Sequence, residues 1–166
     1  MPLVTFDSLP DDSRVWVFAA DPPLQDAGAE QLLDDVERFL AGWQAHGEPL
    51  RAGYDWRESR FLTVAVDQST AGASGCSIDG MYRTLRALEP ALGASLVGGG
   101  RVFYREPTGA VAAVSRETFG DLAAAGAVGR RTPVFDTTIT ALGDWRARFE
   151  RPLAESWHAQ LVPAAR

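Results

Sequence analysis

The stretch Arg14-Val-Trp-Val-Phe-Ala-Ala decides the fold of this chain. Its apolar side chains occupy both alternating faces, which is typical of a strand that is buried on both sides. Residues 61–66, Phe-Leu-Thr-Val-Ala-Val, have the same two-sided character. Residues 50–56 alternate instead, with apolar or aromatic side chains at every second position. This pattern predicts that residues 50–57 form an edge strand and that 14–20 and 61–66 are neighbouring central strands.

Two helices are expected between these strands. Residues 29–46 carry one apolar stripe, and Gly47 stands where a glycine often ends a helix. A second apolar stripe predicts a helix over residues 76–92. With a last strand at residues 101–105, the order βαββαβ predicts a ferredoxin-like α+β unit with both helices on one face of its sheet.

The glycines at residues 98–100 suggest a boundary between a ferredoxin-like unit, residues 1–98, and a C-terminal extension, residues 99–166, although both could form one domain. The extension is expected to hold a hairpin at 101–114, a helix capped by Ser115, a short strand and helices at 140–149 and 153–161. The second face of the first sheet also needs a cover. We expect residues 101–161 to supply it, with the apolar side chains Phe103, Phe119, Leu122, Val134, Phe135 and Trp145.

Composition narrows the classes of function. The chain has 166 residues, a net charge of −6, one cysteine and no lysine. Without lysine there is no P-loop of the pattern G-x-x-x-x-G-K-[ST], so that type of ATPase activity is not expected. The acidic balance argues against nucleic acid, and the two histidines give no metal-binding pattern. No cofactor, membrane span or signal peptide is expected, and the protein is interpreted as cytoplasmic.

Four stretches resemble a family of small bacterial proteins of unknown function: Arg14-Val-Trp-Val-Phe, Trp43-Gln-Ala-His-Gly-Glu-Pro-Leu, Ala73-Ser-Gly-Cys-Ser-Ile-Asp and Pro152-Leu-Ala-Glu-Ser-Trp. Members are sometimes labelled "ABC transporter ATPase", and the family implies no catalytic residues. Residues 102–145 are also similar to bacterial GYF-like modules, although Phe135 replaces the usual tryptophan. That resemblance implies a β/α extension that mediates protein contacts.

The loop before the second helix holds the only cysteine, Cys76. A helix N-terminus and small neighbouring residues favour a reactive thiol or a bound ligand there, so the candidate ligand-binding residues are Ser74, Gly75, Cys76, Ser77 and Asp79. The interpretation that we favour is structural: a buried cysteine, with the serines and the aspartate capping the helix.

Arginine and tryptophan gather near the C-terminus and are the residue types favoured at protein interfaces. The candidate contact residues are Trp145, Arg146, Arg148 and Trp157, with core packing as the alternative for each tryptophan. His46 and His158 are expected to have capping or surface roles. We therefore expect a non-catalytic binding or assembly protein that contacts another protein or itself. The alternative is a thiol-dependent enzyme or redox sensor that uses Cys76.

Overall fold

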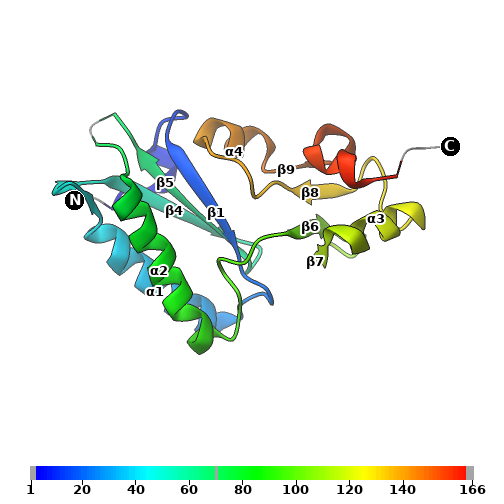
Figure 1. Ribbon diagram of the computed structural model, residues 1–166, viewed down its shortest axis with the longest axis horizontal. Helices are drawn as coiled ribbons and strands as arrows, with labels where there is room; N and C mark the ends of the chain where they lie inside the picture. Colours follow the sequence, from blue (N-terminus) through cyan, green and yellow to red (C-terminus); the bar gives the residue numbers. More distant parts are fainter. Residues whose placement is uncertain (1–2, 70, 164–166) are drawn as a thin grey trace. The chain divides into compact units, whose positions relative to one another are not determined.

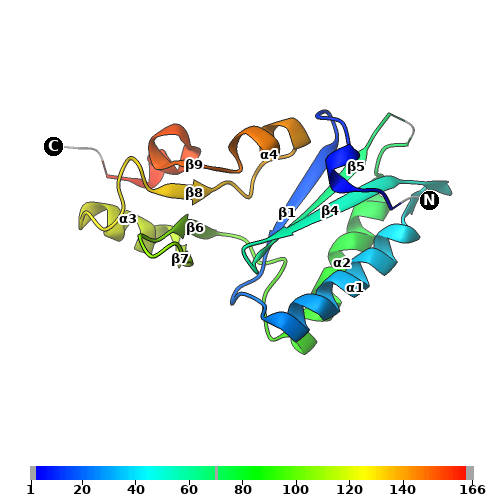
Figure 2. The same cartoon turned by 180° about the vertical axis from the view of Figure 1, so that it is seen from behind.

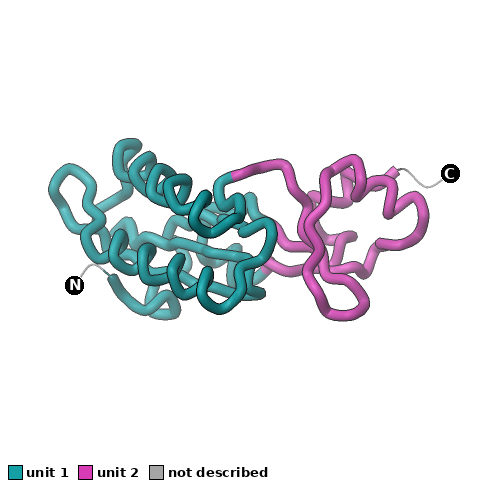
Figure 3. The backbone as a smooth tube through the Cα atoms, turned by 90° about the horizontal axis from the view of Figure 1, so that it is seen from below, with its two compact units in different colours: residues 1–97, 137–147 teal, residues 98–136, 148–166 magenta. Residues whose placement is uncertain are grey.

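The computed structural model describes residues 3–69 and 71–163. The chain divides into two compact units: unit 1 comprises residues 1–97 and 137–147, and unit 2 comprises residues 98–136 and 148–166 (Figure 3). The division after residue 97 lies beside the glycines that suggested a boundary. Residues 137–147, which we expected in the C-terminal extension, belong to unit 1. The protein is therefore an α+β protein in which a late segment of the chain completes the first unit.

Unit 1 is built on a three-stranded antiparallel sheet in the order β1-β5-β4, namely β1 (Arg14–Ala19), β5 (Phe61–Asp67) and β4 (Arg51–Arg57). Trp16 pairs with Val64, and Ala65 on the same central strand pairs with Gly53. The predictions that residues 14–20 and 61–66 are neighbours and that residues 50–57 lie at an edge are confirmed. The central strand is β5, whereas β1 lies at the other edge of the three-stranded sheet, so the prediction that residues 14–20 form a central strand is wrong.

The expected last strand of a ferredoxin-like sheet belongs elsewhere. In the structure, β6 (Arg101–Arg105) pairs with β7 (Val111–Ser115) and β8 (Pro133–Phe135) in unit 2. A tight turn containing Gly109, whose φ is 93°, joins β6 to β7. Closing this local hairpin costs less chain entropy than pairing β6 with β1, which lies much earlier in the chain. Among the described residues, the sheet of unit 1 therefore has three strands, and the expectation that residues 101–105 complete it is wrong.

Helices α1 (Asp26–Ala41) and α2 (Gly75–Leu92) lie on one face of this sheet, as the two views from opposite sides show (Figure 1, Figure 2). Alternate residues of the strands and one stripe of each helix form a shared core. Its buried members include Trp16, Phe18, Leu32, Val36, Leu40, Leu62, Val64, Met81 and Leu85.

The first helix ends earlier than the sequence predicts. α1 stops at Ala41, and His46 and Gly47 form the turn of a small hairpin between β2 (Gln44–Ala45) and β3 (Glu48–Pro49). Both turn residues have positive φ, 51° and 81°, as a two-residue hairpin turn of the primed type requires. The apolar stripe extends to Trp43, whose side chain is buried, but Trp43 lies beyond the end of α1. The prediction of a helix over residues 29–46 is therefore wrong at its C-terminal end.

The second face of the sheet is covered by two segments that lie far apart in the sequence. The N-terminal turn η1 (Phe6–Ser8) and α4 (Leu142–Arg148) meet where the rings of Phe6 and Trp145 lie 5.0 Å apart, edge to face. The segment before α4 is also tied to β1, because the Val15 amide donates to the Thr140 carbonyl over 2.9 Å. Trp145 thus acts as expected, whereas the contribution of Phe6 was not predicted.

Unit 2 contains a four-stranded sheet in the order β7-β6-β8-β9, with β9 at Glu150–Pro152 and α3 at Arg116–Ala124. Its last segment forms the 3-10 turns η2 (Leu153–Glu155) and η3 (Trp157–Leu161), not the helix predicted for 153–161. Several side chains expected to cover the first sheet instead form a core cluster of unit 2, which holds Val102, Tyr104, Phe119, Val128, Val134 and Leu153, with Leu122 against it. No helix in the described part of the chain is long and apolar enough to cross a membrane.

Candidate binding site

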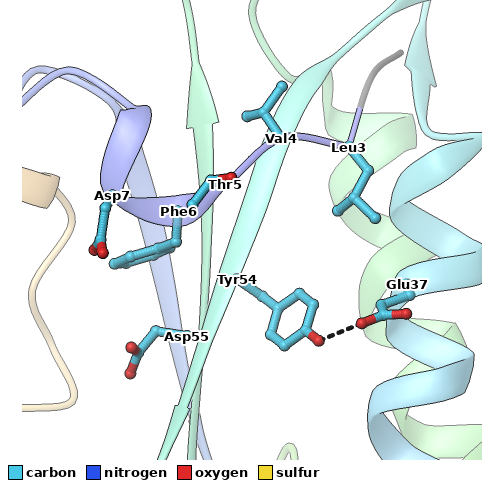
Figure 4. Close-up of a pocket in the computed structure, with 8 residues that line it drawn as sticks. All are labelled: Leu3, Val4, Thr5, Phe6, Asp7, Glu37, Tyr54 and Asp55. Atoms are coloured by element: carbon cyan, nitrogen blue, oxygen red, sulfur yellow. Dashed lines mark hydrogen bonds between the residues drawn. The ribbon is translucent and has the colours of Figure 1, made fainter.

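A hollow of about 570 Å³ lies beside the edge strand β4 in unit 1 (Figure 4). It is open to solvent and is lined by residues of the N-terminal segment, α1 and β4. We call it the edge groove and define it by Leu3, Val4, Thr5, Phe6, Asp7, Glu37, Tyr54 and Asp55.

The path of the N-terminal segment creates the groove. Leu3 forms a parallel bridge with Ala52, and the Val4 amide donates to the Ala52 carbonyl over 2.8 Å. The segment then crosses to the second face of the sheet at Gly53. A Cβ at Gly53 would lie 2.7 Å from the Val4 carbonyl oxygen and 3.1 Å from the Phe6 amide nitrogen, so only glycine leaves room for this crossing. The segment therefore leaves the edge of β4 after pairing with Ala52.

Beyond this crossing, the edge of β4 is open. In an antiparallel ladder, the backbone groups of successive residues point alternately toward the two neighbouring strands. Because Ala52 bonds outward to Val4, the backbone groups of Tyr54 and Trp56 also point outward, and those of Gly53 and Asp55 point to β5. Among the described residues, no backbone hydrogen bond joins the outward groups of Tyr54 or Trp56 to another strand.

Carboxylates stand on both sides of this edge. Asp7 and Asp55 lie on the side of the N-terminal turn, and Glu37 projects from α1 on the other (Figure 4). The Tyr54 hydroxyl donates a 2.5 Å hydrogen bond to Glu37. Burial, followed by this hydrogen bond and the charges of Glu37 and Asp34, raises the pKa of Tyr54 to about 12. The groove is thus a polar, acidic surface with a neutral phenol at neutral pH.

The loop before α2, which was predicted as a ligand site, does not bury its cysteine. Cys76 is exposed in the first turn of α2, so the expectation of burial is wrong. Ser74 and Ser77 do cap the helix: the Ser77 amide donates to the Ser74 hydroxyl over 3.2 Å, and the Ser74 amide donates to the Ser77 hydroxyl over 2.7 Å. Asp79 is not part of this cap and forms an exposed ion pair with Arg83 at 3.0 Å.

Trp43 anchors the same helix start to the core. Its indole N–H donates to the carbonyl of Ser77 over 2.8 Å, and its ring meets that of Trp16 edge to face at 6.0 Å. Gly75 is exposed at the surface, and a Cβ added there would meet no described atom within 4 Å. The loop that was predicted as a ligand site is therefore organised by helix capping, with an accessible thiol beside the cap.

The predicted protein-contact residues make contacts within their own units. Trp145 is buried, and the guanidinium of Arg57 lies 4.3 Å from the centre of its ring. Arg146 forms a 2.6 Å ion pair with Asp11 and donates to the Leu9 carbonyl over 2.8 Å. Arg148 is exposed at the end of α4. These contacts give Trp145 and Arg146 structural roles, which was the alternative interpretation for the tryptophan.

Trp157 and His158 form a stacked pair in unit 2, with ring centres 4.0 Å apart. The Trp157 indole donates to Asp136 over 3.2 Å, and the Ser156 hydroxyl lies 2.7 Å from Nδ1 of His158. Burial lowers the pKa of His158 from 6.5 to about 4, with Asp136 opposing this change and Arg116 adding to it. The expected surface or capping role of His158 is wrong, because the imidazole is a neutral core group. The other histidine, His46, is exposed in its hairpin turn.

Sequence reasoning did not find the edge groove, although the alternation of residues 50–56 did locate the strand that carries it. The missing signal was the pairing of Leu3 and Val4 with Ala52, which no local pattern reveals. In the described residues, no group of three or more histidine, cysteine or acidic side chains is arranged to hold a metal ion. Comparisons with known protein families, curated proteins and solved structures found no match.

Proposed function

We propose that this protein is a non-catalytic binding or assembly protein that holds part of another polypeptide in the edge groove. The observation that carries the proposal is the meeting of an open strand edge at Tyr54 and Trp56 with carboxylates on both sides of it. Open strand edges bind polypeptide through main-chain hydrogen bonds, and charged rims select which polypeptide binds. A cytoplasmic location is part of this proposal.

A photo-crosslinking experiment tests this function in cells. A benzophenone amino acid placed at Thr5, an exposed residue of the groove, should give a discrete crosslinked product with a partner protein. The same group at Arg86, exposed on α2, is the matched control and should not give that product. Neutralising the rim with Asp7→Asn and Glu37→Gln should weaken the product from Thr5. Identical products from Thr5 and Arg86, or none from Thr5, would argue against binding in the groove.

The exposure of Cys76 favours a second candidate function, that of a thiol-dependent enzyme or redox sensor. A redox sensor should lose its response in cells when Cys76 is replaced by serine, whereas a groove-binding protein should keep its crosslinked partner. The Cys76→Ser variant carrying the benzophenone at Thr5 therefore separates the two functions. Loss of the Thr5 product in this variant would favour the thiol.

A further inference from the structure

We propose that the partner segment is short, extended and basic, and that it adds to the sheet of unit 1 as a strand beside β4. This inference rests on the binding function proposed above and names the chemistry of the partner. It follows from the backbone groups at the edge and from the charges on either side of them.

The backbone determines the length and conformation of the segment. Tyr54 and Trp56 each present an outward N–H and C=O, and the pairing of Leu3 and Val4 with Ala52 blocks the edge before them. Outward-pointing residues alternate along a strand, so these two positions can pair with a segment of about four residues, each of which adds about 3.3 Å to its length. Pairing in this way would satisfy the backbone groups of both partners, which is the basis of strand addition in peptide recognition.

The charges determine which side chains the segment carries. Side chains of an added strand would point alternately to the two faces of the sheet. On the helix face they would meet Glu37, with Asp34 close enough to act on the Tyr54 hydroxyl. On the other face they would meet Asp7 and Asp55.

Asp55 is already paired with a cation, so on that face an incoming basic side chain would depend on Asp7. Arg57 donates to Asp55 over 2.7 and 3.2 Å, and the same guanidinium lies over the ring of Trp145. Asp7, Asp34 and Glu37 are exposed and keep the rim acidic. Basic side chains at consecutive positions of the segment would therefore find a carboxylate on each face, while acidic side chains would be repelled on both.

Peptide titration followed by NMR tests the inference on the full chain. The probe is a capped peptide, Thr-Val-Arg-Arg-Val-Thr, whose β-branched residues favour an extended chain. It should bind saturably and shift the amide signals of Tyr54 and Trp56. The matched peptide Thr-Val-Glu-Glu-Val-Thr should not bind. Methylation of every interior backbone nitrogen of the arginine peptide should abolish binding, because it removes the donors that pair with β4.

Variants of the protein test the acidic rim. Asp7→Asn and Glu37→Gln should each weaken binding about two- to fivefold, in the range of exposed charge pairs. Asp79→Asn removes an exposed carboxylate on α2 and is the matched control, which should leave the affinity unchanged. Sodium chloride should weaken binding of the arginine peptide to the wild-type protein and should have less effect on the Glu37→Gln variant.

The possible failures have different meanings. If the methylated peptide binds as well as the unmethylated one, strand addition is refuted while binding in the groove stands. If the glutamate peptide binds as well, the basic partner is refuted. Absence of saturable binding by the arginine peptide overturns the inference altogether, and the crosslinking from Thr5 then decides independently whether the groove binds another partner.

Discussion

The hydroxyl of Tyr54 donates a 2.5 Å hydrogen bond to the carboxylate of Glu37 and so ties β4 to α1 at the rim of the edge groove. The bond has two consequences. It fixes one carboxylate beside the open strand edge, and it adds to the effect of burial, which is the larger cause, in raising the pKa of Tyr54 to about 12. Both consequences can be measured with a single conservative variant, Tyr54→Phe.

Removal of the Tyr54 hydroxyl should change how stability depends on pH. Because the pKa is raised in the folded state, the phenol contributes stability below pH 10, and this contribution is lost as the pH rises toward 12. Urea unfolding of the wild type should therefore weaken more steeply between pH 10 and 12 than that of Tyr54→Phe. At pH 7 the variant should lose about 0.5–1.5 kcal/mol. Parallel pH profiles for the two proteins would show that folding does not raise the pKa of Tyr54.

The crossing of the N-terminal segment at Gly53 should be intolerant of even one added methyl group. Gly53→Ala places a Cβ 2.7 Å from the Val4 carbonyl oxygen and should cost about 1–3 kcal/mol of unfolding free energy. Gly80→Ala is the matched control, because Gly80 lies within α2 with open space around it. That change should stabilise the protein by about 0.5–1 kcal/mol. Equal effects in urea unfolding would mean that residues 4–6 do not pack on Gly53.

Cys76 should react with a disulfide reagent in the native protein. The thiol is exposed at the start of α2, so labelling should not require unfolding and should proceed at the same rate with or without low concentrations of urea. Cys76→Ala should change stability by no more than about 0.5 kcal/mol, as for other surface substitutions. Labelling that appears only above the unfolding midpoint would restore the interpretation of Cys76 as a buried structural residue.

His158 should remain neutral well below the usual pKa of histidine. In a His46→Gln variant, the remaining imidazole NMR signal should titrate with a midpoint near pH 4. Because the pKa is lowered on folding, the stability from the neutral ring is present above pH 6.5 and is lost as the pH falls toward 4. A midpoint close to 6.5 would show that the imidazole is accessible to water and not part of the core of unit 2.

The sequence predicted the sheet of unit 1 well where burial is periodic. The adjacent residues Val15 and Trp16 on β1 are both buried, and β5 is buried throughout, as the apolar residues on both faces predicted. These two strands are neighbours in the structure. The alternation of β4 likewise located the edge. Such local patterns are informative because side-chain direction repeats every two residues in a strand.

Long-range pairing explains what the sequence did not predict. Trp43 fits the apolar stripe of α1 but lies after the end of that helix, just before the hairpin of β2 and β3. A buried side chain at this spacing does not show whether the helix continues or a hairpin begins. β6 matched the expected last strand but found nearer partners in β7 and β8. The groove depends on Val4 reaching Ala52, which lies far along the chain, and on Gly53 admitting the crossing. The pattern of residues 1–10 contains no sign of this pairing.

Amide hydrogen exchange at four successive residues of β4 tests the open edge most directly. In the free protein, the amides of Gly53 and Asp55 point to β5 and should exchange slowly, whereas those of Tyr54 and Trp56 point outward and should exchange much faster. This alternation is the predicted result. Slow exchange at all four residues would show that the edge is already occupied in the free protein, and it would contradict the proposal that the groove receives a partner strand.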